Sequence, residues 1–263
     1  MYELQNRVAV VTGGTSGIGL ATVQLLLQNG ARVALCSRNA QNIERTLQDL
    51  KRLFPDGDVF GMPCDVLNKA AVASFAQSVQ DTFGPADVLI NNAGQGRVST
   101  FDGTDDDAWM QELQLKFMSV IHPTRHFLPQ LEQSGQGAIV CVNSLLAIQP
   151  EPHMVATSAA RAGIANLVRS LATELAPKGI RVNGIFLGLV DSGQWRRRFA
   201  ARNEPTQNWE SWSRDLAITK QIPLQRLGAP IEAARAIAFL ASPLSSYTTG
   251  SHIDVSGGLN RHV

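Results

Sequence analysis

The stretch TGGTSGIG, residues 12–19, decides the fold of this chain. It directly follows the apolar run Arg7–Thr12 and opens the amphipathic stretch Ile18–Asn29. Glycines here let the backbone turn sharply and approach a pyrophosphate closely, while the free N–H groups at the start of a helix point at the anion. Because strand, glycine-rich loop and helix follow one another in this order, the stretch predicts a dinucleotide-binding unit.

Short apolar runs alternate with longer amphipathic segments along the whole chain. The runs are apolar throughout, which is typical of strands covered on both faces. The predicted strands are Arg7–Thr12, Arg32–Cys36, Val59–Pro63, Val88–Ile90, Ala138–Asn143, Arg181–Leu187 and His252–Val255. The predicted helices are Ile18–Asn29, Asn42–Leu53, Lys69–Phe83, Asp105–Leu131, Ala159–Leu175 and Ile231–Leu240. This order predicts one α/β domain over residues 1–263: a doubly wound, Rossmann-type, seven-stranded parallel sheet with helices on both faces.

One segment, at about residues 189–223, contains no recognisable strand. It begins just after the end of a predicted strand, where ligands bind in open α/β sheets, and its length is typical of a binding segment. We therefore expect it to form a substrate lid. Its tryptophans, Trp195, Trp209 and Trp212, either line an apolar pocket or hold the lid against the body of the protein.

Composition narrows the class of protein. A net charge of +1 in 263 residues favours neither a nucleic-acid surface nor a polybasic membrane patch. The N-terminal apolar run is too short for a signal peptide or a membrane span, so we expect a soluble, cytoplasmic protein. The three cysteines, Cys36, Cys64 and Cys141, fit neither a disulfide framework nor a zinc site and are expected to be buried thiols. We expect no metal.

Further motifs extend the pattern of the glycine loop. Asn91–Gly94 follows the fourth predicted strand, Cys64–Val66 follows the third, and Gly188–Ser192 follows the sixth. With the loop spacing TGxxxGxG, this combination resembles the short-chain dehydrogenase/reductase family over nearly the whole chain. The resemblance implies an oxidoreductase that acts on a small-molecule carbonyl or secondary alcohol with a nicotinamide dinucleotide. The cofactor-binding residues that it implies are Thr12, Gly13, Thr15, Ser16, Gly17, Ile18, Gly19, Ser37, Arg38, Asp65, Val66, Asn92, Ala93, Gly94, Arg161, Gly188, Val190 and Ser192.

The end of the second predicted strand bears on the choice of dinucleotide. An acidic side chain there would accept hydrogen bonds from the ribose 2′-hydroxyl of NAD. This chain has Ser37 followed by Arg38 instead, and a guanidinium grips a phosphate with paired hydrogen bonds. The sequence therefore favours NADP(H), with NAD(H) left possible because Arg38 alternatively stacks on adenine or faces solvent.

The catalytic positions depart from the family pattern, which is Asn, Ser, Tyr and Lys. Ser144 matches the serine, but the tyrosine position is Thr157 and the lysine position is Arg161. The asparagine position, seven residues after Trp109, is Lys116. A threonine hydroxyl is far less acidic than a phenol, and an arginine keeps its charge without releasing a proton. Cofactor binding is expected to survive these changes, whereas the usual proton donor is missing.

Two side chains are candidate substitutes for that proton donor. His153, four residues before Thr157, precedes the predicted helix Ala159–Leu175, and histidine titrates near neutral pH; its alternative is a loop histidine without a catalytic role. Lys116 donates a proton if Arg161 lowers its pKa, and is otherwise a second cation for an anionic ligand.

Two functions remain open at this point. The first is an NADP(H)-dependent oxidoreductase with an unusual proton donor; the second is a catalytically silent dinucleotide-binding sensor or partner subunit. The long segments Asp105–Leu131 and Ala159–Leu175 resemble those that the family packs into dimers, usually within tetramers. We therefore expect a homotetramer.

Overall fold

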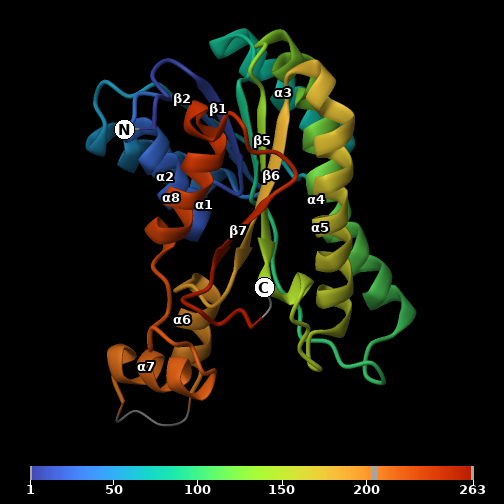
Figure 1. Ribbon diagram of the computed structural model, residues 1–263. Coiled ribbons are helices and arrows are strands. Elements are labelled where there is room, and N and C mark those ends of the chain that lie inside the picture. Colours follow the sequence, from blue (N-terminus) through green and yellow to red (C-terminus); the bar gives the residue numbers. More distant parts are fainter. Residues whose placement is uncertain (1, 203–206, 262–263) are drawn as a thin grey trace.

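Seven parallel strands form one sheet in the order β3-β2-β1-β4-β5-β6-β7 (Figure 1). This computed structural model describes residues 2–202 and 207–261. The strands are β1 (Val8–Thr12), β2 (Arg32–Ser37), β3 (Val59–Pro63), β4 (Val88–Asn91), β5 (Ala138–Ser144), β6 (Arg181–Leu187) and β7 (His252–Val255). The α-helices are α1 (Gly17–Gln28), α2 (Ala40–Leu53), α3 (Lys69–Phe83), α4 (Asp106–Gln133), α5 (Val155–Leu175), α6 (Gly193–Ala200), α7 (Trp209–Thr219) and α8 (Pro230–Ala241). The predicted single α/β domain is confirmed.

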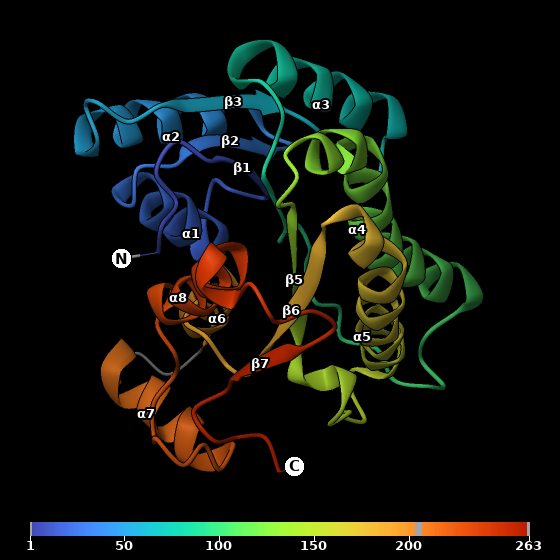
Figure 2. The same cartoon turned by 45° about the horizontal axis from the view of Figure 1, so that its top comes forward.

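Helices cover both faces of the sheet (Figure 2). On one face α1, α2 and α8 pack through residues such as Leu26 and Ile237. On the other face α3, α4 and α5 pack through residues such as Phe75, Phe127 and Ile164. All five residues of β1 are buried, so a run without polar alternation occupies the centre of the sheet as expected.

The strand order reverses direction at β1, which lies between β2 and β4. In open α/β sheets the crevice beyond the carboxyl ends of the strands at such a point receives the ligand. The residues that follow β1, β4 and β5 therefore converge at one edge of the sheet. The site described below is built from these loops.

The segment predicted to form a lid contains α6 and α7, which lie beyond the end of β6 (Figure 1). Residues 203–206 of that prediction lie outside the described residues. Trp209 and Trp212 pack against Phe199, with ring centroids 5.4 Å and 5.5 Å from it, and the Arg196 guanidinium lies 3.8 Å from the Trp209 ring. These aromatic side chains therefore stabilise the segment itself.

The three cysteines are free and buried, as the sequence predicts. Burial raises the pKa of the Cys141 thiol to about 12, which makes it a poor nucleophile. Over the described residues there is no group of three or more His, Cys, Asp or Glu side chains that could hold a metal ion. Among the described helices, none combines the length and the apolarity that crossing a membrane requires.

Candidate active site

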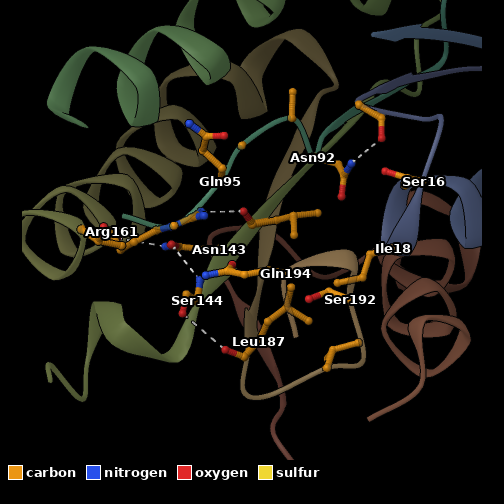
Figure 3. Close-up of a pocket in the computed structure, with 18 of the residues that line it drawn as sticks. Ser16, Ile18, Asn92, Gln95, Asn143, Ser144, Arg161, Leu187, Ser192 and Gln194 are labelled. Atoms are coloured by element: carbon orange, nitrogen blue, oxygen red, sulfur yellow. Dashed lines mark hydrogen bonds between the residues drawn. The ribbon is translucent and has the colours of Figure 1, made fainter. Parts of the chain in front are cut away.

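One cavity of about 740 Å³ runs from the glycine loop to the segment with α6. Figure 3 shows Ser16, Ile18 and Asn92 on one side of it and Ser144 and Arg161 on the other. The first group comes from the loops after β1 and β4 and from the start of α1, whereas the second comes from β5 and α5. The topological switch point and the predicted catalytic positions thus share one cavity.

The glycine loop is held against the loop after β4 by hydrogen bonds. Asn92 donates its side-chain amide to the carbonyl oxygens of Thr12, at 2.9 Å, and Gly13, at 3.1 Å. The Thr12 hydroxyl accepts from the backbone N–H groups of Asn92 and Ala93, both at 3.0 Å. Gly13 has a φ of +69°. A Cβ at Gly19 would lie 2.2 Å from the Gly13 carbonyl oxygen, so the loop needs glycine there.

The structure brings most of the predicted cofactor-binding residues to this cavity. Those that line it are Gly13, Thr15, Ser16, Ile18, Gly19, Ser37, Arg38, Asp65, Val66, Asn92, Ala93, Gly94, Arg161, Gly188, Val190 and Ser192. Thr12 and Gly17 do not line the cavity. The Thr12 hydroxyl instead connects the glycine loop to the loop after β4. Ser16 caps α1 without a side-chain hydrogen bond, which leaves the first N–H groups of that helix without a side-chain cap.

At the adenosine end predicted from the sequence, Arg38 is exposed and lines the cavity. The structure gives its guanidinium no hydrogen bond or ion pair with any described residue. The Asp65 carboxylate, across the cavity edge, accepts from the backbone N–H of Leu67 at 3.0 Å and so has a local role in its own turn. Arg38 therefore retains its full donor capacity for a ligand.

Ser144 and Arg161 lie together at the end of β5. The Ser144 hydroxyl accepts from the Leu146 N–H at 3.3 Å and makes only a long contact, 3.5 Å, with the Leu187 carbonyl. Arg161 donates from Nη1 to the Val142 carbonyl at 2.9 Å, and its buried Nε has no partner among the described residues. Burial lowers the pKa of Arg161 to about 10, so it stays a cation at neutral pH. Both side chains keep donor capacity for a ligand.

Thr157 belongs to the first turn of α5, because that helix begins at Val155, four residues before its predicted start. Its side chain lines the cavity and is almost completely buried. The Thr157 hydroxyl is bonded to the Glu112 carboxylate and also lies 3.3 Å from the Arg97 carbonyl. Both partners are acceptors, so the hydroxyl proton points away from the cavity in this arrangement.

Lys116 lies behind the wall of the cavity and does not line it. Its ammonium donates to the Glu112 carboxylate and to the Gln95 carbonyl, both at 2.6 Å. Lys116, for which the sequence left open a proton donor or a second cation for a ligand, is thus directed toward Glu112 on the same helix. Burial and the nearby Arg161 guanidinium lower the pKa of Lys116, while Glu112 opposes that change.

His153 lines the cavity near its entrance and is about half exposed. Its Nε2 lies 3.2 Å from the Glu151 carboxylate, and the Lys220 ammonium lies 2.9 Å from the same oxygen. His153 thus belongs to a separate charged group at the cavity mouth. Lys220, just after α7, ties the predicted lid to the loop before α5.

Comparison with known proteins decides the family. Residues 7–203 match the family model described as short chain dehydrogenase. The chain belongs to the short-chain dehydrogenase/reductase family. Among curated relatives, an uncharacterized short-chain type dehydrogenase/reductase of Sinorhizobium fredii is 36% identical, with the match covering 98% of this chain and 99% of the relative.

Two solved members of this family cover the whole chain. A short-chain oxidoreductase from Pseudomonas aeruginosa PAO1, solved with NADPH bound and described as containing an atypical catalytic centre, is 64% identical with a TM-score of 0.97 over 100% of both chains. L-sorbose reductase from Gluconobacter frateurii, complexed with NADPH and L-sorbose, is 30% identical with a TM-score of 0.94, covering 100% of this chain and 99% of that one.

Sequence reasoning missed one residue of this short-chain dehydrogenase/reductase site. Glu112 is 2% exposed and contacts both Thr157 and Lys116, two of the substituted positions. Its spacing of four residues from Lys116 is a signal that the sequence does contain, but the same spacing is common on exposed helix faces. Trp195 lines the cavity, which is one of the two roles that the sequence left open for the tryptophans.

Proposed function

We propose that this protein is an NADP(H)-dependent oxidoreductase that interconverts a small-molecule carbonyl and a secondary alcohol. The observation that carries the proposal is the single cavity joining the glycine loop to Ser144 and Arg161. Family membership supports an oxidoreductase, and the NADPH-bound structures of two relatives support the cofactor.

The shape of the cavity fits a dinucleotide. The glycine loop lines the cavity at the start of α1, where a pyrophosphate would meet helix N–H groups without a side-chain cap, and the Arg161 side chain lines the other end. Gly94, Val190 and Ser192 line the space between. NADPH bound there would supply the hydride.

Ser144 and Arg161 are then the side chains that orient the reacting groups. The weakly held Ser144 hydroxyl donates a hydrogen bond to the carbonyl oxygen of the substrate. Arg161 places a permanent positive charge beside the cofactor ribose, where the family has a lysine. Thr157 and His153 also line the cavity, and the source of the transferred proton is considered below.

The second candidate function is a dinucleotide-binding protein without turnover. The observation that favours it is the direction of the Thr157 hydroxyl, which is bonded to Glu112 rather than presented to the cavity. Under this alternative NADPH binding alone would serve as a signal or stabilise a partner subunit. Binding and turnover must therefore be measured separately.

The first experiment measures both. NADPH binding is followed by its fluorescence, and NADPH oxidation is followed with a 3-oxoester, an α-diketone, an aromatic aldehyde and a ketose. The control restores the family tetrad through Lys116→Asn, Thr157→Tyr and Arg161→Lys. Glu112→Leu is added because Lys116→Asn would leave a buried carboxylate without its ammonium.

We expect the natural protein to bind NADPH and to reduce at least one carbonyl of the panel. Turnover would establish that the substituted site works. Binding by the natural protein without any turnover, together with an active restored variant, would contradict the proposed reaction and favour the second function.

Arg38→Ala is expected to weaken NADPH binding about 10- to 100-fold, because it removes charge-assisted hydrogen bonds to the 2′-phosphate. NADH binding should change little, since NADH lacks that phosphate. The matched control is Arg52→Ala. Arg52 lies in α2, is paired with Asp49 and does not line the cavity. Equal weakening of both dinucleotides would instead place Arg38 against the adenine.

The oligomeric state and the cellular location stay predictions. A homotetramer and a cytoplasmic location are what the family resemblance and the composition lead us to expect. Light scattering measures the first, and a monomer would contradict it.

A further inference from the structure

The proton donor of the proposed reaction is the open question of the site, and a buried charged cluster lies directly behind it. Glu112, Lys116 and Thr157 are each 2% exposed. Both Lys116 and Thr157 contact the same carboxylate oxygen of Glu112, Oε1. Lys116, Glu112 and Thr157 therefore form a continuous hydrogen-bonded chain that ends at the cavity.

The cluster joins two helices that are far apart in sequence. Glu112 and Lys116 are one turn apart on α4, whereas Thr157 lies in the first turn of α5 and is the member of the hydrogen-bonded chain that lines the cavity. Arg161, one turn further along α5, also lines the cavity, and its positive charge lowers the pKa of Lys116. A proton leaving Lys116 for the cavity thus has a path through Glu112 and then Thr157.

Burial favours release of that proton, and so does Arg161, whereas Glu112 opposes it. The charged groups that face Lys116 are Glu112 on its own helix and Arg161 on α5. Burial and the positive charge of Arg161 lower the pKa of Lys116, so its ammonium gives up a proton more readily than a solvated lysine. Arg161 itself does not release a proton at neutral pH.

We infer that Glu112 relays the proton of the reaction between Lys116 and the Thr157 hydroxyl. In the direction of reduction, hydride adds to the carbonyl carbon and the electron pair of the C=O double bond moves to oxygen. The Lys116 ammonium gives a proton to the Glu112 carboxylate, the carboxyl group so formed gives a proton to the Thr157 oxygen, and Thr157 gives its own proton to the substrate oxygen. After the alcohol leaves, a proton from solvent in the cavity returns to neutral Lys116 through Thr157 and Glu112.

This inference rests on the proposed function, and it answers the difficulty that a threonine is a weak acid. Thr157 never has to ionise, because it receives one proton as it passes on another. The hydroxyl hydrogen must turn from its present acceptors toward the substrate oxygen, and rotation about the Cβ–Oγ1 bond of Thr157 allows this. Glu112 acts through Thr157 and does not touch the substrate.

Glu112→Gln tests the relay with a side chain of the same shape. We expect kcat for carbonyl reduction to fall about 100-fold or more, within the range that general acid catalysis contributes, while KM changes less than about threefold. The matched control is Glu132→Gln: Glu132 is also on α4 and paired with a lysine, Lys178, but both side chains are exposed. It should leave both constants unchanged.

Substitutions of Thr157 separate the relay from a structural role. Thr157→Ser keeps the hydroxyl and is expected to keep most of the activity, whereas Thr157→Val keeps the shape and is expected to lose activity as Glu112→Gln does. If Glu112 only supported the fold, Thr157→Val would fold and turn over normally. A loss with His153→Ala but not with Glu112→Gln would assign the proton to His153 and overturn the relay.

The dependence of kcat on pH tests the relay, because a purely structural role would not change it in the expected way. Reduction needs Lys116 protonated, so kcat should fall as pH rises through the lowered pKa of Lys116. The residual activity of Lys116→Met, which has no ammonium at this position to titrate, should lack that alkaline limb. An alkaline limb at the same pH in both proteins would overturn the relay and leave the proposed function standing.

A measurement without turnover separates failure of the relay from failure of the proposed function. Lysine labelled with ¹³C at Cε is incorporated into the full chain with NADPH bound, and the Lys116 signal is assigned by its loss in Lys116→Met. We expect it to titrate below the range of the other lysines, and lower still in Glu112→Gln. A Lys116 that titrates like the others, or independently of Glu112, overturns the relay whether or not the carbonyl panel shows turnover.

Discussion

Gly19→Ala is expected to abolish measurable NADPH binding, lowering the affinity by more than about 100-fold. A Cβ at this position would lie 2.2 Å from the Gly13 carbonyl oxygen and 2.5 Å from the Asn92 side-chain nitrogen. Neither group can retreat cheaply. The first is backbone of the turn, and the second donates to the carbonyls of Thr12 and Gly13 that it holds in place. The turn must therefore open, and the opening moves the N–H groups that would face the pyrophosphate.

Fluorescence titration with NADPH measures this effect, and circular dichroism checks that the variant is folded. Gly96→Ala is the matched control, because Gly96 also lines the cavity but a Cβ there meets no atom closer than 3.5 Å. We expect the control to bind within about threefold of the natural protein. If Gly19→Ala bound NADPH equally well, the dinucleotide would not lie against this loop.

Glu112→Ala is expected to destabilise the protein by about 3–5 kcal/mol, because it leaves the Lys116 ammonium buried without its carboxylate. Thr157 also loses its nearer acceptor and keeps only the Arg97 carbonyl. The double substitution Glu112→Leu with Lys116→Met should recover most of that loss. A buried ion pair replaced by apolar side chains of similar volume is often neutral for stability.

Denaturation by urea, followed by circular dichroism, gives these free energies of unfolding. Glu132→Ala serves as the control, since its pair with Lys178 is exposed and is worth about 0–1 kcal/mol. Destabilisation by Glu112→Ala no larger than that of Glu132→Ala would mean that the Glu112–Lys116 pair is solvated. In that case the buried cluster described above would not exist in solution.

The sheet and the dinucleotide loop could be predicted from the sequence because both depend on local pattern. Runs without polar alternation, such as Arg181–Leu187, predict strands buried on both faces, and that run forms β6 with the same bounds. Boundaries were less predictable at α5, which starts at Val155 rather than Ala159. The structure thereby places Thr157 inside a helix turn, where its backbone is held and its hydroxyl faces α4.

The proton pathway could not be predicted, because it depends on a contact between helices. Glu112 and Thr157 are 45 residues apart, and nothing local marks them as neighbours. Glu112 and Lys116 alone read as an ordinary pair on a solvated helix face. The sequence leaves open whether Lys116 donates a proton or is a second cation for a ligand, and only the packing of α4 against α5 shows that it is paired with Glu112.

The sequence by itself determined the order of the seven strands and of the helices other than α6 and α7, the glycine loop that follows β1, and the identity of the four substituted or retained catalytic positions. These follow from short-range pattern and spacing, since period and loop chemistry act over a few residues. Only the tertiary structure decided which of those side chains reach the cavity and which are paired behind its wall. Burial and the partners of a charge depend on the packing of distant elements, and they determine whether Lys116, Glu112 and Thr157 can exchange a proton.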